Sequence, residues 1–219
     1  MKTKLMELYD LLLAEFGPQQ WWPADTVTEM MIGAVLTQAV SWRNVEKAIN
    51  NLHCQGALNF EVIDGMSQES LAHLIKPTGY YNAKARKLKE LARFVVREHG
   101  NDLDSLLSTP LEELRRQLLG VWGIGPETAD CIILYGAKQP SFVIDAYTLR
   151  IFSRLGLEAL GTDYRSLRRR LMEILPLDPG LYQDFHALLV SLGKNFCRKS
   201  VPLCQQCPLG NICKTGCHQ

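Results

Sequence analysis

The stretch Leu119-Gly120-Val121-Trp122-Gly123-Ile124-Gly125-Pro126 contains the strongest local signal in the chain. Gly120 interrupts one helical pattern, and Pro126 is typical of the first position of another helix. The stretch therefore predicts two helices joined by a Gly-Ile-Gly turn, because glycine permits a positive φ and close approach of the backbone. Unsatisfied N–H groups and the helix dipole at the second helix favour an anion such as phosphate. Val121 and Ile124, interleaved with the glycines, and an aspartate downstream favour this interpretation over a plain turn between helices.

Helical periodicity continues on both sides of this turn, and strand patterns are almost absent. Leu5, Leu8 and Leu12 share one helical face, and Thr109-Pro110 is typical of a capped helix start. We therefore predict an all-α fold. The helices are expected to cover, in chain order, residues up to 16, 28–38, 42–52, 70–76, 82–99, 110–119, 126–135, 146–155, 163–175 and 180–195.

The composition is that of an ordinary globular protein. The chain has 219 residues, of which 47% are hydrophobic and 21% charged, with a formal net charge of +1. This apolar fraction excludes a disordered chain, and the balanced charge excludes a strongly electrostatic protein. No apolar run reaches the roughly 18 residues of a membrane span, and the acidic, amphipathic N-terminus is unlike a secretory signal. We therefore expect a cytoplasmic protein.

Seven cysteines are unevenly distributed along the chain. Cys54 and Cys131 lie inside apolar helical patterns, where we expect small buried thiols. An odd total and the absence of a secretory signal argue against disulfides and favour a metal site. Four thiolates could hold either zinc or an iron–sulfur cluster, and Cys217 is expected to be free. The clustered cysteines near the C-terminus are Cys197, Cys204, Cys207, Cys213 and Cys217.

Four separated motifs occur in the order found in one family of enzymes. Over nearly its whole length, the chain resembles the helix-hairpin-helix DNA glycosylases of the endonuclease III type. This resemblance implies a six-helix barrel with the hairpin at residues 25–135, a cluster domain at residues 1–24 and 136–219, and a DNA cleft between them. The motifs are Val35-Leu36-Thr37-Gln38, Gly79-Tyr80-Tyr81-Asn82-Ala83-Lys84-Ala85, the hairpin followed by Phe142-Val143-Ile144-Asp145-Ala146-Tyr147-Thr148-Leu149-Arg150, and the cysteine tail.

The resemblance also implies a cofactor. The spacing of Cys197, Cys204, Cys207 and Cys213 matches the [4Fe–4S] loop of endonuclease III, whereas structural zinc usually shows two short-spaced pairs of ligands. We therefore expect these four cysteines to hold a [4Fe–4S] cluster. Arg198 and Lys199, between the first two ligands, are expected to contact phosphates of DNA.

Asp145 is the expected catalytic residue. Its place before an amphipathic pattern indicates a helix N-cap, and in the resembling family the aspartate after the hairpin is the catalytic carboxylate. One residue can serve both purposes. Cleavage of an N-glycosidic bond builds positive charge on the sugar, which a fixed carboxylate stabilises while it helps to orient water toward C1′.

Glu127 stands where bifunctional relatives carry a lysine that forms a Schiff base with the sugar. A carboxylate cannot form an imine, so we expect hydrolysis of the glycosidic bond without lyase activity. Taken alone, Glu127 is a solvated acid that suits the first turn of its helix. A glycosylase/lyase that uses another amine, such as Lys194, is the alternative enzyme. A non-catalytic module that senses DNA structure is the alternative from another class.

An aromatic linker is expected to form the pocket for the extruded base. Adjacent tryptophans cannot share one helical face, and indole faces attract a cationic base. Trp-Trp-Pro, an aromatic four residues after Gln38 and the presence of Glu127 resemble the 3-methyladenine DNA glycosylase III branch. That branch implies an alkylated purine such as 3-methyladenine as the substrate, whereas Trp122 is expected in the core. The pocket residues are Trp21, Trp22, Pro23 and Trp42, with Trp22 and Trp42 as the walls.

Further residues are expected to contact double-stranded DNA. Gln38 and Tyr80 match family positions that fill the gap left by an extruded base, and a capping glutamine and a packed tyrosine are the alternatives. Residues 76–99 carry seven Lys and Arg against two Glu, and residues 165–170 carry four Arg. Each cluster alone is an ordinary solvated helix face, but with the hairpin they suggest a basic DNA-binding face. The hairpin residues expected to bind phosphate are Gly123, Ile124 and Gly125.

The sequence therefore predicts a monofunctional base-excision DNA glycosylase that removes an alkylated purine. It is expected to act as a monomer on damaged double-stranded DNA, away from membranes, in the cytoplasm and associated with the nucleoid in a bacterium.

Overall fold

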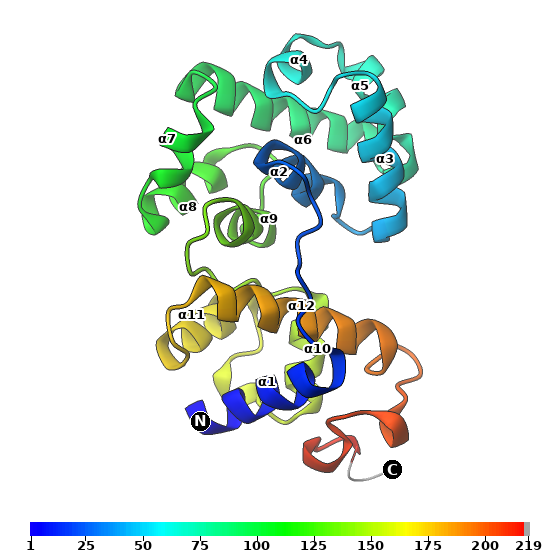
Figure 1. The fold of residues 1–219 in the computed structure, drawn as a ribbon, viewed down its shortest axis with the longest axis vertical. Coiled ribbons are helices and arrows are strands. Elements are labelled where there is room, and N and C mark those ends of the chain that lie inside the picture. Colours follow the sequence, from blue (N-terminus) through cyan, green and yellow to red (C-terminus); the bar gives the residue numbers. More distant parts are fainter. Residues whose placement is uncertain (217–219) are drawn as a thin grey trace. The chain divides into compact units, whose positions relative to one another are not determined.

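The computed structural model describes residues 1–216, and the regular elements in this range are all helical (Figure 1). This confirms the predicted all-α fold. Contacts within the chain define two compact units, Trp22–Lys138 and the pair of segments Met1–Trp21 and Gln139–Gln219. No described helix is both long enough and apolar enough to span a membrane.

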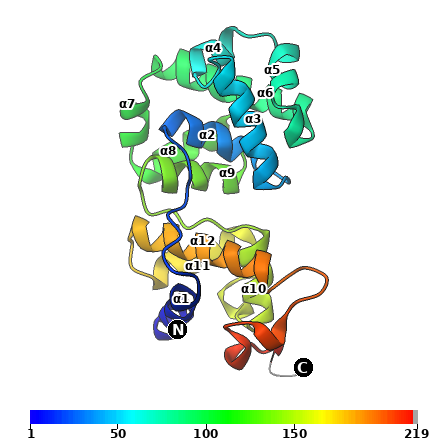
Figure 2. The ribbon, with the colours of Figure 1, turned by 45° about the vertical axis from the view of Figure 1, so that its right-hand side comes forward.

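The unit Trp22–Lys138 is built around one buried helix. All residues of α2 from Met30 to Leu36 are buried, as expected for a helix that is apolar on every side. It contacts α3, α6 and α9, which lie around it in Figures 1 and 2. The helices of this unit are α2 (Val27–Leu36), α3 (Trp42–Cys54), α4 (Phe60–Gly65), α5 (Gln68–Leu74), α6 (Tyr81–Arg93), α7 (Leu103–Ser108), α8 (Leu111–Gly120) and α9 (Pro126–Cys131).

Several boundaries in this unit differ from the prediction. The predicted helices 82–99 and 126–135 each end in a π-helical turn, at Phe94–Glu98 and Ile132–Gly136. The sequence pattern does not predict α4 and α7, which are too short to show clear periodicity. Each begins after a side-chain cap, Asn59 or Asp102. Pro110 is the cap of α8 rather than its first residue.

The segments Met1–Trp21 and Gln139–Gln219 form the second unit. In it, α12 packs against both α1 and α10. The ring centroid of Phe185 on α12 lies 5.5 Å from that of Tyr9 and 5.8 Å from that of Phe142. These apolar contacts hold the N-terminal helix to the rest of the unit. The helices are α1 (Lys2–Phe16), α10 (Ala146–Arg154), α11 (Tyr164–Ile174) and α12 (Pro179–Asn195).

Two burial predictions are wrong. Cys54 is exposed, because the buried face of α3 includes Leu52 and a residue two positions later points away from that face. Trp122 is 47% exposed rather than part of the core. Cys131 is buried as predicted. Cys217 lies outside the described residues.

Candidate functional site

The hairpin lies between α8 and α9. Ile124 N donates a hydrogen bond of 3.1 Å to Val121 O, and both side chains are buried, which anchors the turn in the core of its unit. Gly123 has a φ of +87°, whereas Gly125 has an extended backbone with a φ of −89°. Of these two glycines, Gly123 is therefore the one that requires the conformational freedom of glycine.

Lys87 on α6 joins the hairpin to the turn after α2. Its aliphatic stem covers Gly123 so closely that a Cβ atom on residue 123 would overlap Lys87 Cγ. Its Nζ donates a hydrogen bond to Gln38 Oε1. Gln38 Nε2 in turn donates to Thr128 Oγ1 on α9 over 2.9 Å. The predicted gap-filling residue Gln38 is thus held by side chains from α6 and α9.

Tyr80 lies in a turn with unusual backbone geometry. It is 79% exposed and is therefore not a packed tyrosine, and its φ of +46° is uncommon for a residue other than glycine. The buried Lys84 Nζ holds this turn to α2, because it donates to Leu36 O over 2.9 Å and to Thr78 O over 2.8 Å. Burial, and then the positive charge of Lys87, lower the pKa of Lys84 to about 8.

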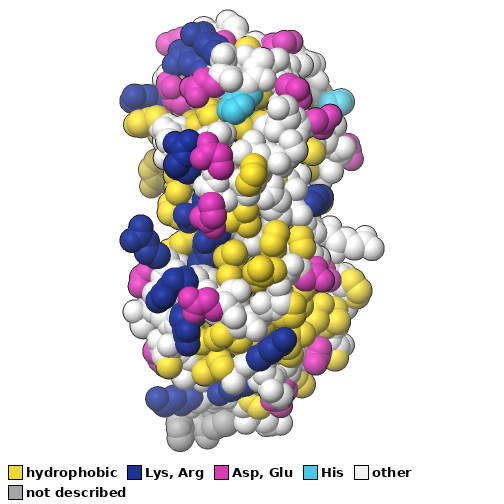
Figure 3. All heavy atoms as spheres, turned by 90° about the vertical axis from the view of Figure 1, so that its left-hand side faces the viewer, with side chains coloured by type: hydrophobic (Ala, Val, Ile, Leu, Met, Phe, Trp, Pro, Cys, Tyr) yellow, Lys and Arg dark blue, Asp and Glu magenta, His cyan; other side chains and the backbone are white. Residues whose placement is uncertain are grey.

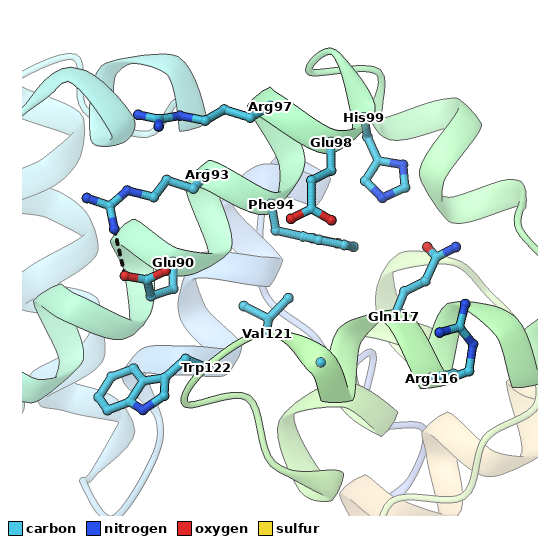
Figure 4. A pocket seen from close by; sticks show the side chains of 11 residues that line it. Glu90, Arg93, Phe94, Arg97, Glu98, His99, Arg116, Gln117, Val121 and Trp122 are labelled. Atoms are coloured by element: carbon cyan, nitrogen blue, oxygen red, sulfur yellow. Dashed lines mark hydrogen bonds and ion pairs between the residues drawn. The ribbon is translucent and has the colours of Figure 1, made fainter.

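Trp122 projects from the hairpin into solvent. The guanidinium carbon of Arg86 lies 3.8 Å from the centroid of its ring, which is a cation–π contact. Trp122 also borders an open groove of about 760 Å³, which Figure 4 shows with Phe94, Glu98 and His99 on its other side. The exposed position of Trp122 therefore follows from its place at the outer side of the turn, with Arg86 as its packing partner.

Several cations of the first predicted basic cluster, residues 76–99, make contacts within the folded unit. Lys84 and Lys89 are buried, and their ammonium groups donate to backbone carbonyls. Arg93 pairs with Glu90 over 2.7 Å (Figure 4). Arg97 pairs with an aspartate of α4 over 3.1 Å. Most of these charges therefore already have partners within the unit, and the predicted basic DNA-binding face stays a prediction.

Three of the four arginines of the second predicted cluster also have partners in their unit. Arg169 and Arg170 both form ion pairs with Glu173, and Arg168 donates to the buried hydroxyl of Ser141 over 2.8 Å. The face drawn in Figure 3 shows Lys and Arg side chains interspersed with Asp and Glu side chains. The positive charge of these arginines is partly compensated by Glu173, so charge alone would not draw the phosphates of DNA to them.

Asp145 is the N-cap of α10, as the sequence pattern predicts. Its Oδ1 accepts hydrogen bonds from Thr148 N over 2.7 Å and from Thr148 Oγ1 over 2.8 Å. Its Oδ2 lies 3.7 Å from Nε2 of His186, and the Asp145 side chain is only 12% exposed. Burial alone would raise the pKa of this carboxyl, but the interactions with His186 and Thr148 outweigh it and lower the pKa below its usual value.

His186 was not predicted as a site residue. It lies on α12 in the same unit as Asp145 and is 5% exposed. The available signal was a histidine inside the apolar stretch Phe185-His186-Ala187-Leu188, because a buried polar side chain in a helix requires a polar partner. The sequence does not say which partner that is.

The aromatic residues divide between the two units. Trp22 packs edge-on against Trp42, with ring centroids 5.6 Å apart and an interplanar angle of 85°, and against Tyr135 at 5.5 Å. The structure thus brings the two predicted pocket walls, Trp22 and Trp42, into contact with each other. Trp21 belongs to the other unit, where Lys194 Nζ lies 5.8 Å from its ring centroid. Pro23 is exposed.

The cysteine loop forms one cavity with four thiols in its lining. No group of three His, Cys, Asp or Glu residues in the described part of the chain is arranged to ligate a single metal ion. Burial, and to a lesser extent the neighbouring thiols, raise the pKa of Cys207. Thiolates are ligands both of zinc and of iron–sulfur clusters, so the four thiols that line this cavity are residues that could hold a metal centre. The four are Cys197, Cys204, Cys207 and Cys213.

Arg154 anchors this loop to α10. Its guanidinium donates to Cys197 Sγ over 3.3 Å, to Arg198 O over 2.7 Å and to Lys199 O over 3.0 Å. The backbone of Arg198 and Lys199 is thereby fixed while both side chains are exposed.

The two residues that bear on lyase chemistry are both exposed. Glu127 lies in the first turn of α9, which follows the hairpin. Lys194 lies in the last turn of α12 in the other unit. The structure thus places a carboxylate, and no amine, at the first turn after the hairpin.

Residues 32–177 match the HhH-GPD superfamily of base excision DNA repair proteins. A Methanocaldococcus jannaschii protein that is named as a candidate DNA repair glycosylase is 42% identical over 216 residues, which cover 95% of each chain.

Two solved structures of DNA repair enzymes have a similar fold. A trapped covalent complex of endonuclease III with DNA gives a TM-score of 0.85 at 21% identity and covers 100% of this chain and 98% of that chain. The H. pylori 3-methyladenine DNA glycosylase bound to 1,N6-ethenoadenine gives a TM-score of 0.72 at 28% identity and covers 87% of this chain and 94% of that chain.

Proposed function

Because this chain belongs to the HhH-GPD superfamily of base excision DNA repair proteins, we propose that it is a DNA glycosylase that hydrolyses the N-glycosidic bond of a damaged base in double-stranded DNA. The environment of Asp145 carries this proposal. Its carboxylate is fixed by Thr148 and His186, which keep its pKa low despite burial. An ionised and immobile carboxylate is suited to stabilise positive charge on the sugar.

The two oxygens of Asp145 have different tasks in this mechanism. Oδ1 accepts both hydrogen bonds from Thr148, so Oδ2, on the side of His186, is the oxygen that faces the reaction. As the bond between C1′ and the base breaks, its electron pair leaves with the base and positive charge develops on the sugar. Oδ2 stabilises that charge and accepts a proton from the attacking water as the water oxygen bonds to C1′, which leaves a hydroxyl on the sugar.

The proposed enzyme is monofunctional. Glu127, the residue in the first turn after the hairpin, has no nitrogen that could form an imine with the sugar. The competing proposal is a glycosylase/lyase that uses Lys194, whose exposed ammonium lies in the same unit as Asp145. A non-catalytic module is the alternative from another class, and release of free base would exclude it.

We propose an alkylated purine such as 3-methyladenine as the substrate. The support is the 28% identical relative that is itself a 3-methyladenine glycosylase, together with the aromatic cluster of Trp22, Trp42 and Tyr135. Indole and phenol rings attract a cationic base, and alkylation at N3 makes adenine a cation that leaves readily. Such a base needs extrusion, stacking and a carboxylate more than it needs a strong general acid.

The four cysteines of the C-terminal loop are proposed to hold a [4Fe–4S] cluster. Their thiols share one cavity, and Arg154 donates to Cys197 Sγ. When bound, such a cluster supplies folding free energy by cross-linking the loop, since metal binding and folding are coupled. The residues of this chain then hold the loop to α10 and expose Arg198 and Lys199 for contact with phosphates.

Release of free base from duplexes with a single modified base tests the proposal. We expect release of 3-methyladenine by the wild-type protein and no covalent trapping on abasic-site DNA by borohydride. If only an uncharged base is released, the proposed alkylpurine substrate is wrong but the proposed glycosylase activity stands. Release of no base from any duplex, with intact DNA binding, would favour the non-catalytic module.

A further inference from the structure

We propose that Lys87 Nζ binds one phosphate of the DNA backbone beside Gly123, and that the side chain of Gln38 is the partner of this ammonium only while DNA is absent. The choice of DNA as the ligand rests on the proposed function, but the inference does not depend on base release. Lys87 lies on α6, outside the hairpin itself, so the hairpin motif does not include it.

The partner of Lys87 distinguishes it from the other cations of α6 and the turn after it, of which Arg86 stacks on the ring of Trp122. Lys84 and Lys89 are buried on backbone carbonyls, and Arg93 and Arg97 pair with carboxylates. The partner recorded for Lys87 is the neutral carboxamide oxygen of the Gln38 side chain. A hydrogen bond between an ammonium and a phosphate oxygen, in which both groups are charged, is stronger than one to a neutral amide. A phosphate can therefore displace Gln38.

The position of Lys87 is fixed by the hairpin. Gly123 has a positive φ and no side chain, and the stem of Lys87 occupies the space that a Cβ atom would need. Packing of the stem restricts the rotamers of the lysine, so less side-chain entropy is lost when its ammonium binds a ligand. Lys87 remains partly exposed, which leaves its ammonium accessible from solvent.

A second positive charge lies close to this ammonium. The charge of Lys87 contributes to the lowered pKa of Lys84, which means that the two ammonium groups repel each other. An anion bound at Lys87 reduces this repulsion. The electrostatics of the pair therefore favour phosphate over a neutral partner.

When the ammonium of Lys87 binds a phosphate in place of Gln38, the side chain of Gln38 loses one of its two hydrogen bonds. The carboxamide then keeps its bond to Thr128 and loses the one to Lys87. The next residue, Ala39, has a φ of +54°, and such strained backbone persists where surrounding contacts hold it. Binding of DNA at Lys87 is thus coupled to release of one of the contacts that fix the turn of Gln38.

The test is the salt dependence of binding to an undamaged duplex, which requires no catalysis. Lys87→Met keeps an aliphatic stem on Gly123 and removes the charge. We expect the slope of log K against log salt concentration to become shallower by about 0.9, the value for one phosphate contact. Lys87→Arg should retain the wild-type slope. Lys4→Met, which removes a charge from the exposed surface of α1, should also retain it.

Gln38→Ala provides a second readout, because it removes the competitor for Lys87. Because Gln38 is itself expected to contact DNA, the readout is the salt slope and not the affinity: Gln38→Ala should keep the wild-type slope, and Gln38→Ala combined with Lys87→Met should show the slope of Lys87→Met alone. An unchanged slope for Lys87→Met, or an equal change for Lys4→Met, would overturn the proposal. Loss of base release with the expected slopes would instead count against the proposed function alone.

Competition by inorganic phosphate tests whether the site at Lys87 binds free phosphate or a phosphate of the DNA backbone. Added at constant ionic strength, it should compete with the duplex no better than chloride does. Stronger competition by phosphate in the wild type, lost in Lys87→Met, would assign the site to free phosphate and overturn its assignment to the DNA backbone.

Discussion

His186 on α12 and Asp145 at the start of α10 face each other, with His186 Nε2 3.7 Å from Asp145 Oδ2. Both side chains are almost buried, and the histidine is one of the groups that lower the pKa of the carboxyl against the effect of burial. A carboxyl with a lowered pKa adds to the free energy of unfolding above its usual pKa near 3.8, and this contribution is lost as the pH falls through the lower folded-state pKa.

His186→Gln should raise the pKa of Asp145, because the substitution removes an interaction that favours the charged form. The acidic limb of the pH profile of kcat/KM is therefore expected to move to higher pH, while activity at neutral pH changes less. His53→Gln, at an exposed position of α3, is the matched control and should leave the profile in place. Identical profiles for wild type and His186→Gln would show that His186 does not act on Asp145.

The cysteine loop predicts a definite metal content. Protein purified without oxygen should be brown and contain about four irons per chain. Cys204→Ser should lose iron and lower the thermal stability of its unit, because ligation contributes folding free energy. Cys54→Ser changes an exposed cysteine outside the loop and should retain both properties. Stoichiometric zinc in a colourless protein would contradict the cluster.

Helices were easier to predict than the partners of their side chains. The hairpin, the cap at Asp145 and the periodic stripe of α1 follow from local rules about glycine, proline, capping and apolar spacing. The pairing of Asp145 with His186 joins residues far apart in the sequence, and no local rule specifies it. The same holds for the basic clusters, where Arg97 and Lys89 find partners that only the folded unit supplies.

In the aromatic linker, adjacency in the sequence does not predict which residues pack together. Adjacent tryptophans at positions 21 and 22 suggest a shared pocket, but the boundary between the two units falls between them. Trp22 packs with Trp42 and Tyr135, whereas Trp21 packs near Lys194. The partner Tyr135 lies in a π-helical turn that the periodicity does not reveal.

Lys84 should titrate near pH 8, because burial and the charge of Lys87 lower its pKa. The unfolded chain keeps this proton up to a pKa of about 10.4. Between these values the unfolded state binds more protons than the folded state, so this lysine makes the free energy of unfolding rise with pH. The free energy of unfolding, measured with urea, should rise less between pH 7 and pH 10 in Lys84→Met than in the wild type. Parallel curves would refute the lowered pKa.

Glu127→Lys should introduce an amine at the position where lyase chemistry requires one. We expect weak covalent trapping of this variant on abasic-site DNA by borohydride, and none for the wild type. Glu127→Gln is the control without an amine and should not be trapped. Trapping of the wild type that disappears in Lys194→Ala would establish the glycosylase/lyase alternative in place of the monofunctional enzyme.

Asp145→Asn tests the central claim most directly. Asparagine is as good an N-cap as aspartate, so α10 should stay folded while the negative charge is lost. Asp163→Asn makes the same change at the N-cap of α11 in the same unit and controls for capping. The measurement is the single-turnover rate of 3-methyladenine release from a duplex. We predict a loss of about 10²–10³-fold for Asp145→Asn, as for removal of one electrostatic stabiliser, with duplex affinity retained and Asp163→Asn at the wild-type rate. Release by Asp145→Asn at the wild-type rate would contradict the account.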